Sequence, residues 1–240
     1  MSEAFVRFEM LTGKDKVLLL SRKKVLVFGV GGVGGYVCEA LARSGVGQID
    51  VVDNDKVNLS NINRQIIALN STVGRYKTEV VKERLTDINP HIICNTYNIF
   101  YLPENASVID FSQYDYVVDA IDTVSGKIEI VKGCKEKNVP VVSSMGTGNK
   151  LDPTKILITD IYKTKGCPLA RVMRGLCKKN NIDRLDVVYS TEEPKKVLCT
   201  ENDANTKCEG KSTVASSAFV PSVAGLTIAY HVVKRLLDLC

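Results

Sequence analysis

The sequence of 240 residues lacks the features that mark membrane-inserted, exported or zinc-knuckle proteins. Its start, MSEAFVRFEM, has no apolar signal core, and no run of about 18 apolar residues could span a membrane. Eight cysteines are present, but no two of them are spaced C-x-x-C, so we expect no structural zinc. These absences favour a protein of the reducing cytoplasm, with no membrane association and with its thiols mostly free.

No internal repeat or low-complexity tract divides the chain, whose composition is 45% hydrophobic and 25% charged, as in an ordinary globular protein. A chain of this length can bury one good core, so we expect a single domain with an elaborated second half. The formal net charge is +5. This mildly basic balance permits nucleic-acid binding but does not establish it, because the placement of the charge matters more.

The first half of the sequence alternates strand-like and helix-like segments. We expect strands at residues 24–30, 48–53, 92–97, 115–119 and 139–144, helices at 34–44, 73–88 and 124–138, and a leading amphipathic segment at 8–20. Such alternation predicts an α/β, doubly wound, Rossmann-like fold, in which a mostly parallel sheet carries helices on both faces.

The pattern changes after Gly146. Strand-like stretches follow at 155–162 and 186–190, with a basic helix at 168–180, a polar loop at 191–212 and a nearly all-apolar helix at 223–237. The last helix is apolar on most of its faces, which indicates burial in the core or at a subunit contact. We therefore interpret 1–240 as one domain, with a nucleotide-binding core at 1–145 and a C-terminal elaboration for dimerisation and substrate binding at 146–240.

A glycine-rich turn, GVGGVG, follows the first strand. Gly29, Gly31 and Gly34 match the pattern G-x-G-x-x-G, and Gly32 is a further small residue. Glycine permits a tight turn and a close approach of backbone N–H groups to a phosphate, and the following helix offers its positive end. Asp53 ends the next strand, where a carboxylate suits a ribose hydroxyl. Both NAD and ATP fit this much of the sequence.

The loop after Asp53 favours ATP. An NAD site mainly needs the acid that binds the ribose, whereas this loop adds carboxylate, amide and guanidinium side chains: Asp55, Asn61, Arg64 and Gln65, with Lys77 near the next helix start. Asp119 and Asp122 lie at the carboxyl end of a later strand, where open α/β sheets bind their ligands. Cations for a triphosphate together with an acid for magnesium are typical of a nucleotide-cleaving site.

The motifs GVGGVG, VVDNDKV, SNINRQ, GRYKTE and DAIDT, between residues 25 and about 125, together resemble the ThiF-type adenylating superfamily. This superfamily includes the ubiquitin-activating enzymes and their bacterial relatives in thiamine and molybdopterin synthesis. The resemblance implies that Asp53 holds the ribose of ATP and that Asn61, Arg64 and Lys77 contact its phosphates, with Asp122 beside Mg²⁺. It also implies a homodimer in which an arginine near the N-terminus reaches the partner's ATP, and Arg7 in VRFEML matches that residue.

Two segments of the second half, KTKGCPLARVMRGLCKK and SSAFVPSVAGLTIAYHVVKRLL, resemble the tRNA threonylcarbamoyladenosine dehydratases, so that the resemblance spans nearly the whole chain. It implies adenylation of the carboxylate of the threonylcarbamoyl group on the adenosine beside the anticodon, followed by ring closure and loss of AMP. The nucleophile of the closure belongs to the same side chain, where effective molarities reach on the order of 10⁵ M. No enzyme thiol is therefore required. The sequence leaves undecided whether the protein also binds a cysteine-desulfurase or sulfur-relay partner, and whether it binds a monovalent cation.

The basic helix points to the nucleic acid. Leu169, Val172, Met173 and Leu176 follow the helical pattern i, i+3, i+4, i+7 and are expected to face inward. Arg171, Arg174 and Lys178 then project within about 60° of one another on the other side, at roughly 100° per residue. Beside an adenylating site, we expect these three cations to contact tRNA phosphates; the alternative is a solvated helix face.

Alternatives remain for the cysteines and for the function. Cys38, Cys94 and Cys134 lie in helix or strand patterns and are expected to be small core residues. Cys167, Cys199 and Cys208 lie in polar segments near basic residues, where a reactive thiol competes with a structural one. The two alternative functions are activation of the C-terminus of a sulfur-carrier or ubiquitin-like protein and non-catalytic nucleotide binding by a regulator. The absence of zinc knuckles opposes the first, and the set of phosphate-facing residues opposes the second.

Overall fold

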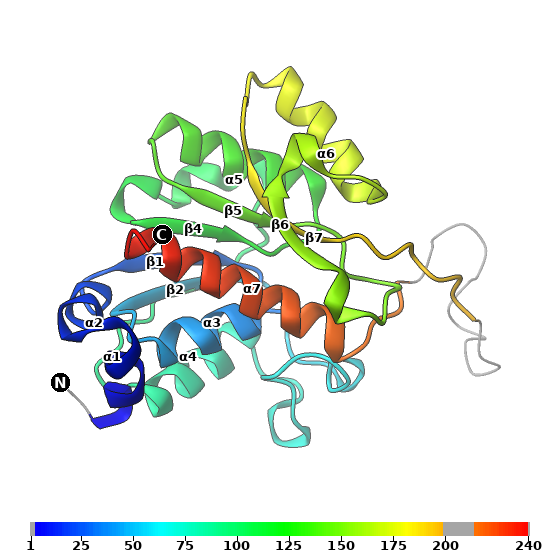
Figure 1. The fold of residues 1–240 in the computed structure, drawn as a ribbon. Coiled ribbons are helices and arrows are strands. Elements are labelled where there is room, and N and C mark those ends of the chain that lie inside the picture. Colours follow the sequence, from blue (N-terminus) through cyan, green and yellow to red (C-terminus); the bar gives the residue numbers. More distant parts are fainter. Residues whose placement is uncertain (1–2, 199–213, 240) are drawn as a thin grey trace.

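The computed structural model describes residues 3–198 and 214–239, and its centre is a seven-stranded sheet in the order β3-β2-β1-β4-β5-β7-β6 (Figure 1). The strands are β1 Lys24–Phe28, β2 Gln48–Val52, β3 Thr96–Tyr97, β4 Tyr116–Asp119, β5 Val141–Ser144, β6 Ile156–Asp160 and β7 Asp186–Ser190. All neighbouring pairs are parallel except β6 with β7, which is antiparallel. The expected α/β, doubly wound fold is confirmed.

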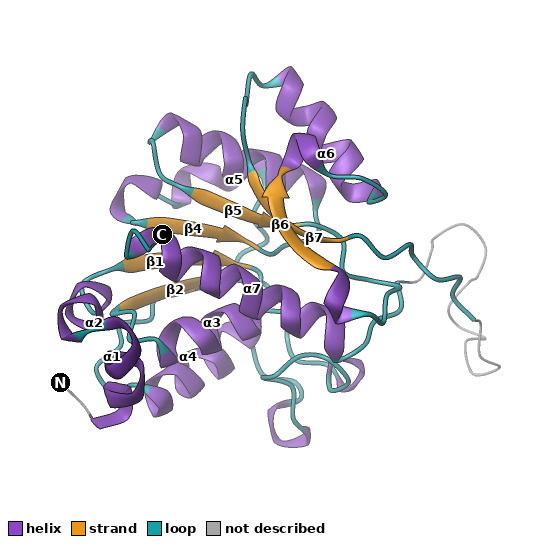
Figure 2. Ribbon diagram, in the orientation of Figure 1, coloured by secondary structure: helices purple, strands orange, loops and turns teal. Residues whose placement is uncertain are grey.

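Helices cover both faces of this sheet (Figure 2). They are α1 Val6–Thr12, α2 Lys14–Leu20, α3 Gly34–Arg43, α4 Lys77–Ile88, α5 Val124–Glu136, α6 Pro168–Lys179 and α7 Phe219–Leu236. Alternate residues of a strand point to opposite faces, so Val25 and Val27 of β1 pack with α3, α4 and α7, while Leu26 and Phe28 pack with α5. One face of α7 is buried against the sheet beside α3, while Phe219, Leu226 and Tyr230 on the helix are exposed.

Several element boundaries differ from the sequence-based expectation. The amphipathic segment 8–20 is two helices, because Gly13 between them has a φ of 90°, outside the helical region. The helix expected at 73–88 begins only at Lys77, since the backbone of residues 74–77 pairs with that of residues 55–57 instead. The apolar helix expected at 223–237 begins at Phe219. The second of these differences places the first residue of α4 directly beside the loop that follows β2.

The cysteines expected in the core are there. Cys38, Cys94 and Cys134 are all buried, and burial raises the pKa of each thiol. Cys199 and Cys208, together with most of the polar loop expected at 191–212, lie outside the described residues. Within the described part of the chain, no helix combines the length and apolarity needed to cross a membrane.

Candidate active site

A cavity of about 810 Å³ opens at the carboxyl ends of β1, β2 and β4. Residues that the sequence assigned to a nucleotide line it together: Gly29, Gly31, Gly32, Asp53, Asp55, Asn61, Arg64, Gln65, Lys77 and Asp122. Two further assigned residues, Gly34 and Arg7, are not among its lining residues. The sheet therefore collects at one edge a set of side chains that are far apart in the sequence.

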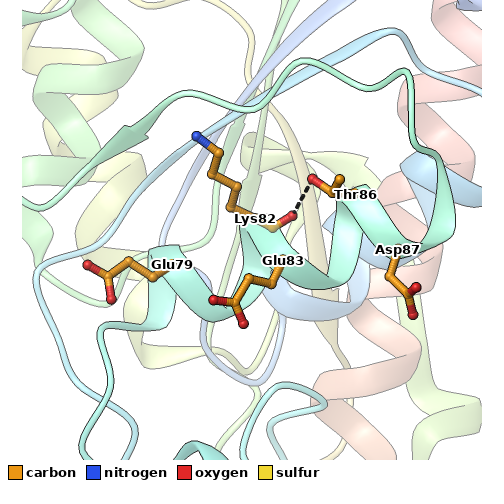
Figure 3. A pocket seen from close by; sticks show the side chains of 5 residues that line it. All are labelled: Glu79, Lys82, Glu83, Thr86 and Asp87. Atoms are coloured by element: carbon orange, nitrogen blue, oxygen red, sulfur yellow. Dashed lines mark hydrogen bonds between the residues drawn. The ribbon is translucent and has the colours of Figure 1, made fainter.

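A second hollow, of about 640 Å³, has a different character. It lies on the outer face of α4, and its lining residues all come from that one helix (Figure 3). Its side chains include three acids, Glu79, Glu83 and Asp87, and one base, Lys82. This hollow is therefore an exposed helix face. The larger cavity is lined by several elements that converge on it, as ligand sites are, and is the better candidate for the site.

The glycine turn is built by close backbone approach. Gly29 has a φ of 79°, and its N–H donates to the Val52 carbonyl oxygen at 2.7 Å. A Cβ on Gly34 would overlap the Gly29 carbonyl oxygen, so only glycine permits this packing of turn against helix. Gly34 thus shapes the turn from behind, whereas Gly31 and Gly32 line the cavity.

Asp53 is fixed at the floor of the cavity. Its carboxylate accepts hydrogen bonds from the backbone N–H groups of Val30, at 2.8 Å, and Asp55, at 2.9 Å. Burial raises the pKa of the Asp53 carboxyl, and the nearby Lys77 ammonium opposes that rise. An acid held in one position beside the glycine turn is the geometry needed to bind a ribose hydroxyl.

Lys77 brings a buried positive charge to the cavity. Only 5% of the residue is exposed, and its Nζ lies 2.6 Å from Asp55 Oδ2 and 4.0 Å from Asp53 Oδ1. A buried ammonium is stable only beside compensating charge, which the two aspartates supply. A polyphosphate entering the cavity would meet this ammonium beside Asp55 and would compete with that carboxylate for it.

The loop between β2 and α4 presents the remaining polar groups. Arg64 is half-buried and its guanidinium donates to the Ser60 carbonyl at 3.0 Å and to Asn63 Oδ1 at 2.9 Å. The Asn61 side-chain oxygen accepts from the Asn58 N–H at 3.0 Å, which orients its amide. The Gln65 side-chain oxygen is buried without a hydrogen-bond partner, and such an atom in a cavity wall favours a polar ligand there.

Asp122 follows β4 on a loop that is clamped from below. Lys127, which is fully buried, donates to Asp119 Oδ1 at 3.0 Å and to the Ile121 carbonyl at 2.9 Å. Ser143 donates to the other Asp119 oxygen. These hydrogen bonds hold the backbone just before Asp122, whose exposed carboxylate lines the cavity. Sequence reasoning noted Asp119 and missed Lys127, whose only signal is one lysine within an otherwise ordinary helix pattern.

The basic helix differs in part from its expected orientation. Arg171 and Lys178 are exposed, but Arg174 is half-buried and donates to the Thr164 carbonyl at 2.8 Å and its hydroxyl at 2.6 Å. Val172, expected to face inward, is 50% exposed. Met173 is buried as expected, and Leu169 and Leu176 are partly buried beside it. The other buried residues of α6 are Ala170 and Cys177, because α6 packs in one apolar cluster with α5 and β7. The expectation that all three cations project freely together is therefore wrong for Arg174.

Cys167 is not exposed, although it lies in a polar segment. It precedes α6, is 6% exposed and packs in the apolar cluster around Met173. Its placement favours the structural alternative. Among the described residues, no group of three or more histidine, cysteine, aspartate or glutamate side chains could hold a metal ion by itself.

The far wall of the cavity was missed by sequence reasoning altogether. It consists of residues 144–148, Leu169, Val214, Ser216 and Pro221. These residues come from three separate segments. Leu169, Ser216 and Pro221 lie in the two segments that carry the family resemblance, but no spacing of charged or polar side chains marks the wall as a binding site.

The fold and this site define a nucleotide-binding α/β protein whose cavity is equipped for a polyphosphate. The ThiF family model matches residues 6–239, and the chain belongs to the ThiF family. It is 42% identical to the tRNA threonylcarbamoyladenosine dehydratase of Bacillus subtilis, over 99% of this chain and 96% of that protein. It is 34% identical to the protein of the same name in Escherichia coli, over 95% of this chain and 91% of that protein.

Solved structures agree with this family membership. The Escherichia coli tRNA N6-threonylcarbamoyladenosine dehydratase in complex with ATP superimposes with a TM-score of 0.85 at 32% identity. The similarity covers 98% of this chain and 94% of that chain. The same enzyme in complex with AMP gives a TM-score of 0.87, again at 32% identity. ATP and AMP binding are observed for that relative, whose fold is the same as the one that forms the cavity in this protein.

Proposed function

We propose that this protein is an ATP-dependent tRNA-modifying enzyme that adenylates the carboxylate of threonylcarbamoyladenosine and promotes its dehydration to the cyclic form. The observation that carries the proposal is the single cavity in which the glycine turn, Asp53, Lys77 and Asp122 converge. Relatives that span nearly the whole chain bear the name of this activity, which supports the same reaction here.

Two substitutions make up the reaction. First, a carboxylate oxygen of the substrate attacks the α-phosphorus of ATP, and the bond to pyrophosphate breaks. Then a nucleophilic atom of the same threonylcarbamoyl group attacks the activated acyl carbon, the bond to AMP breaks and the nucleophile's proton is released. The net result is loss of one water from the substrate, with ATP converted to AMP and pyrophosphate.

The residues of the cavity suit the first step. Lys77 and Arg64 supply positive charge for the phosphates, and backbone N–H groups of the glycine turn add hydrogen-bond donors. Asp122 is the carboxylate that would hold Mg²⁺, because hard cations prefer oxygen ligands and this acid lies exposed at the cavity. Bound Mg²⁺ would neutralise phosphate charge.

We also propose a homodimer in which Arg7 acts on the partner's ATP. Arg7 is an exposed residue of α1 and does not line the cavity of its own chain. Mixing Arg7→Ala subunits with Lys77→Ala subunits should restore activity in one of the two sites of each mixed dimer. Mixed dimers that form without any recovery of activity would count against the shared site.

The decisive experiment is mass analysis of nucleosides from tRNA that has been incubated with the purified protein and ATP. Threonylcarbamoyladenosine should lose the mass of one water, and the loss should require ATP. The Lys77→Ala protein is the matched negative control. Unchanged threonylcarbamoyladenosine, with ATP bound normally by the wild-type protein, would contradict the proposed reaction and favour a carrier-protein activator or a regulator.

A further inference from the structure

The lining of the cavity is divided by charge. All of its charged lining residues, Asp53, Asp55, Arg64, Lys77 and Asp122, come from the first half of the chain. Of the residues that the structure describes, those that line the cavity between positions 144 and 221 carry no charge. A triphosphate belongs in the charged part, where Asp53 is also placed for the ribose, and uncharged residues of the first half, such as Phe100 and Ala120, line the cavity beside them. The uncharged part, along the wall formed by residues 144–148, Leu169 and residues 214–221, is therefore space that the phosphate- and ribose-binding residues do not use.

The outer wall of this uncharged part is a short segment, residues 214–217, that leads into α7. Asn149 holds it through a two-way contact: the Asn149 N–H donates to the Ala215 carbonyl at 2.7 Å, and the Ala215 N–H donates to Asn149 Oδ1 at 2.7 Å. Asn149 has a φ of 60°, a conformation that asparagine tolerates better than most residues. A Cβ on Gly148 would overlap the Val214 side chain, so the wall lies directly against this loop.

The loop that carries Asn149 is itself anchored to the sheet. The Met145 N–H donates to the Val188 carbonyl at 2.8 Å, and the buried Lys150 ammonium donates to the Ser190 carbonyl at 2.9 Å. Asn149 therefore links a fixed base to a segment about 65 residues away in sequence. The Asn149 side chain adds one of three hydrogen bonds between that loop and residues 214–217, the third being donated by Ser217 Oγ to the Lys150 carbonyl at 3.3 Å. Asn63 Nδ2 also donates to the Ser216 carbonyl, at 3.0 Å.

We propose that the uncharged part of the cavity is the pocket for the modified nucleoside, and that Asn149 is a positioning residue for its outer wall. This inference rests on the proposed function. The substrate has one carboxylate, which must lie at the boundary with the α-phosphate, and its urea and base are neutral. Uncharged groups such as Ser144, Thr147 and Leu169 match that neutral part, and further acids there would repel the carboxylate.

The test compares three variants with the wild-type protein. Asn149→Gly keeps the positive φ and loses the side-chain acceptor, whereas Asn149→Asp keeps an acceptor at the same place. Asn138→Gly is the control, because Asn138 also has a positive φ, of 56°, but follows α5, and its N–H donates to the Lys135 carbonyl rather than to the segment 214–217. The measurements are kcat at saturating tRNA and ATP, the Kd of ATP, and the melting temperature.

Asn149→Gly should lower kcat about tenfold or more, since a misplaced wall loosens the reacting geometry. The Kd of ATP should stay within about twofold of the wild-type value, because the phosphate-binding residues are untouched. Asn149→Asp should restore most of kcat, and Asn138→Gly should match the wild-type protein in every measurement. Gly148→Ala, which pushes Val214 outward from the opposite side, should lower kcat in the same way.

Two results would overturn the inference: wild-type kcat in Asn149→Gly and Gly148→Ala, or a loss of ATP affinity that equals the loss of kcat. Either result, with an active wild-type enzyme, leaves the proposed function intact. A wild-type protein that binds ATP and never dehydrates the modified tRNA would instead overturn the proposed function, and this inference with it.

Discussion

The two parts of the cavity are built in opposite ways. The nucleotide part is assembled from residues that follow β1, β2 and β4 and from the first residue of α4, all with charged or glycine-rich signatures. The substrate part is assembled from uncharged residues held by backbone hydrogen bonds between distant segments. Electrostatic binding of phosphate needs particular side chains at fixed places, whereas an uncharged wall needs mainly shape. The nucleotide part can therefore be predicted from a sequence, whereas the substrate part cannot.

The largest effect on the nucleotide part is expected from removing the buried Lys127 ammonium, which pairs with Asp119 next to the loop that carries Asp122. Lys127→Met leaves the carboxylate of Asp119 buried without its cation, and Asp119 is 0% exposed. Breaking such a pair costs about 3–5 kcal/mol of unfolding free energy. Chemical denaturation measures it, with Lys132→Met as control, since Lys132 forms an exposed pair with Glu129 on the same helix. That control should cost less than about 1 kcal/mol. Equal effects in both variants would show that the buried pair does not support the Asp122 loop.

The sequence predicts the nucleotide part of the cavity better than it predicts the substrate part. It predicted the doubly wound fold and collected Gly31, Asp53 and Lys77 in one site, because motif spacing after a strand fixes where a side chain lies. It misplaced Arg174, because helical periodicity cannot show that this long side chain turns back to bond with Thr164. It missed Asn149, because the contact with Ala215 depends on tertiary closure rather than on any local pattern.

The next largest effect concerns the cation of the nucleotide part. Lys77→Ala should lower adenylation by about 10²-fold, the scale for one positioned electrostatic contact. Lys82→Ala is the matched control, because Lys82 lines the hollow on the outer face of the same helix (Figure 3) and is not among the residues that line the nucleotide cavity. Pyrophosphate release is the measurement. Normal turnover in Lys77→Ala, or equal losses in both variants, would remove Lys77 from the site.

A smaller effect is expected outside the cavity, at α6, where the tRNA backbone would extend beyond the substrate part. The double variant Arg171→Ala, Lys178→Ala should weaken tRNA binding while ATP affinity is kept. It should flatten the slope of log K against log salt by roughly one to two units, because fewer counterions are released. Arg174→Ala should leave that slope nearly unchanged, since its guanidinium is bonded to Thr164. An unchanged slope in the double variant would make this helix a solvated face.

The smallest effect is expected at Tyr101, and it tests whether this residue serves the packing of the core or the binding of the nucleotide. Among the described residues, the buried side-chain atoms without a partner are Gln65 Oε1 and the Tyr101 hydroxyl, and both residues line the cavity. The Tyr101 ring packs edge-on against Phe28 at 4.7 Å, and burial raises the pKa of its hydroxyl.

An unpaired buried hydroxyl costs about 1–3 kcal/mol, so Tyr101→Phe should raise the unfolding free energy by about 1 kcal/mol and leave the Kd of ATP unchanged. The reason is that the ring contact with Phe28 is kept while the unpaired hydroxyl is removed. A loss of stability in the denaturation curve would show instead that the hydroxyl is bonded in the folded protein. A weaker Kd of ATP with unchanged stability would show that the Tyr101 hydroxyl, in the cavity wall, takes part in nucleotide binding, and would extend the nucleotide part of the cavity beyond its charged residues.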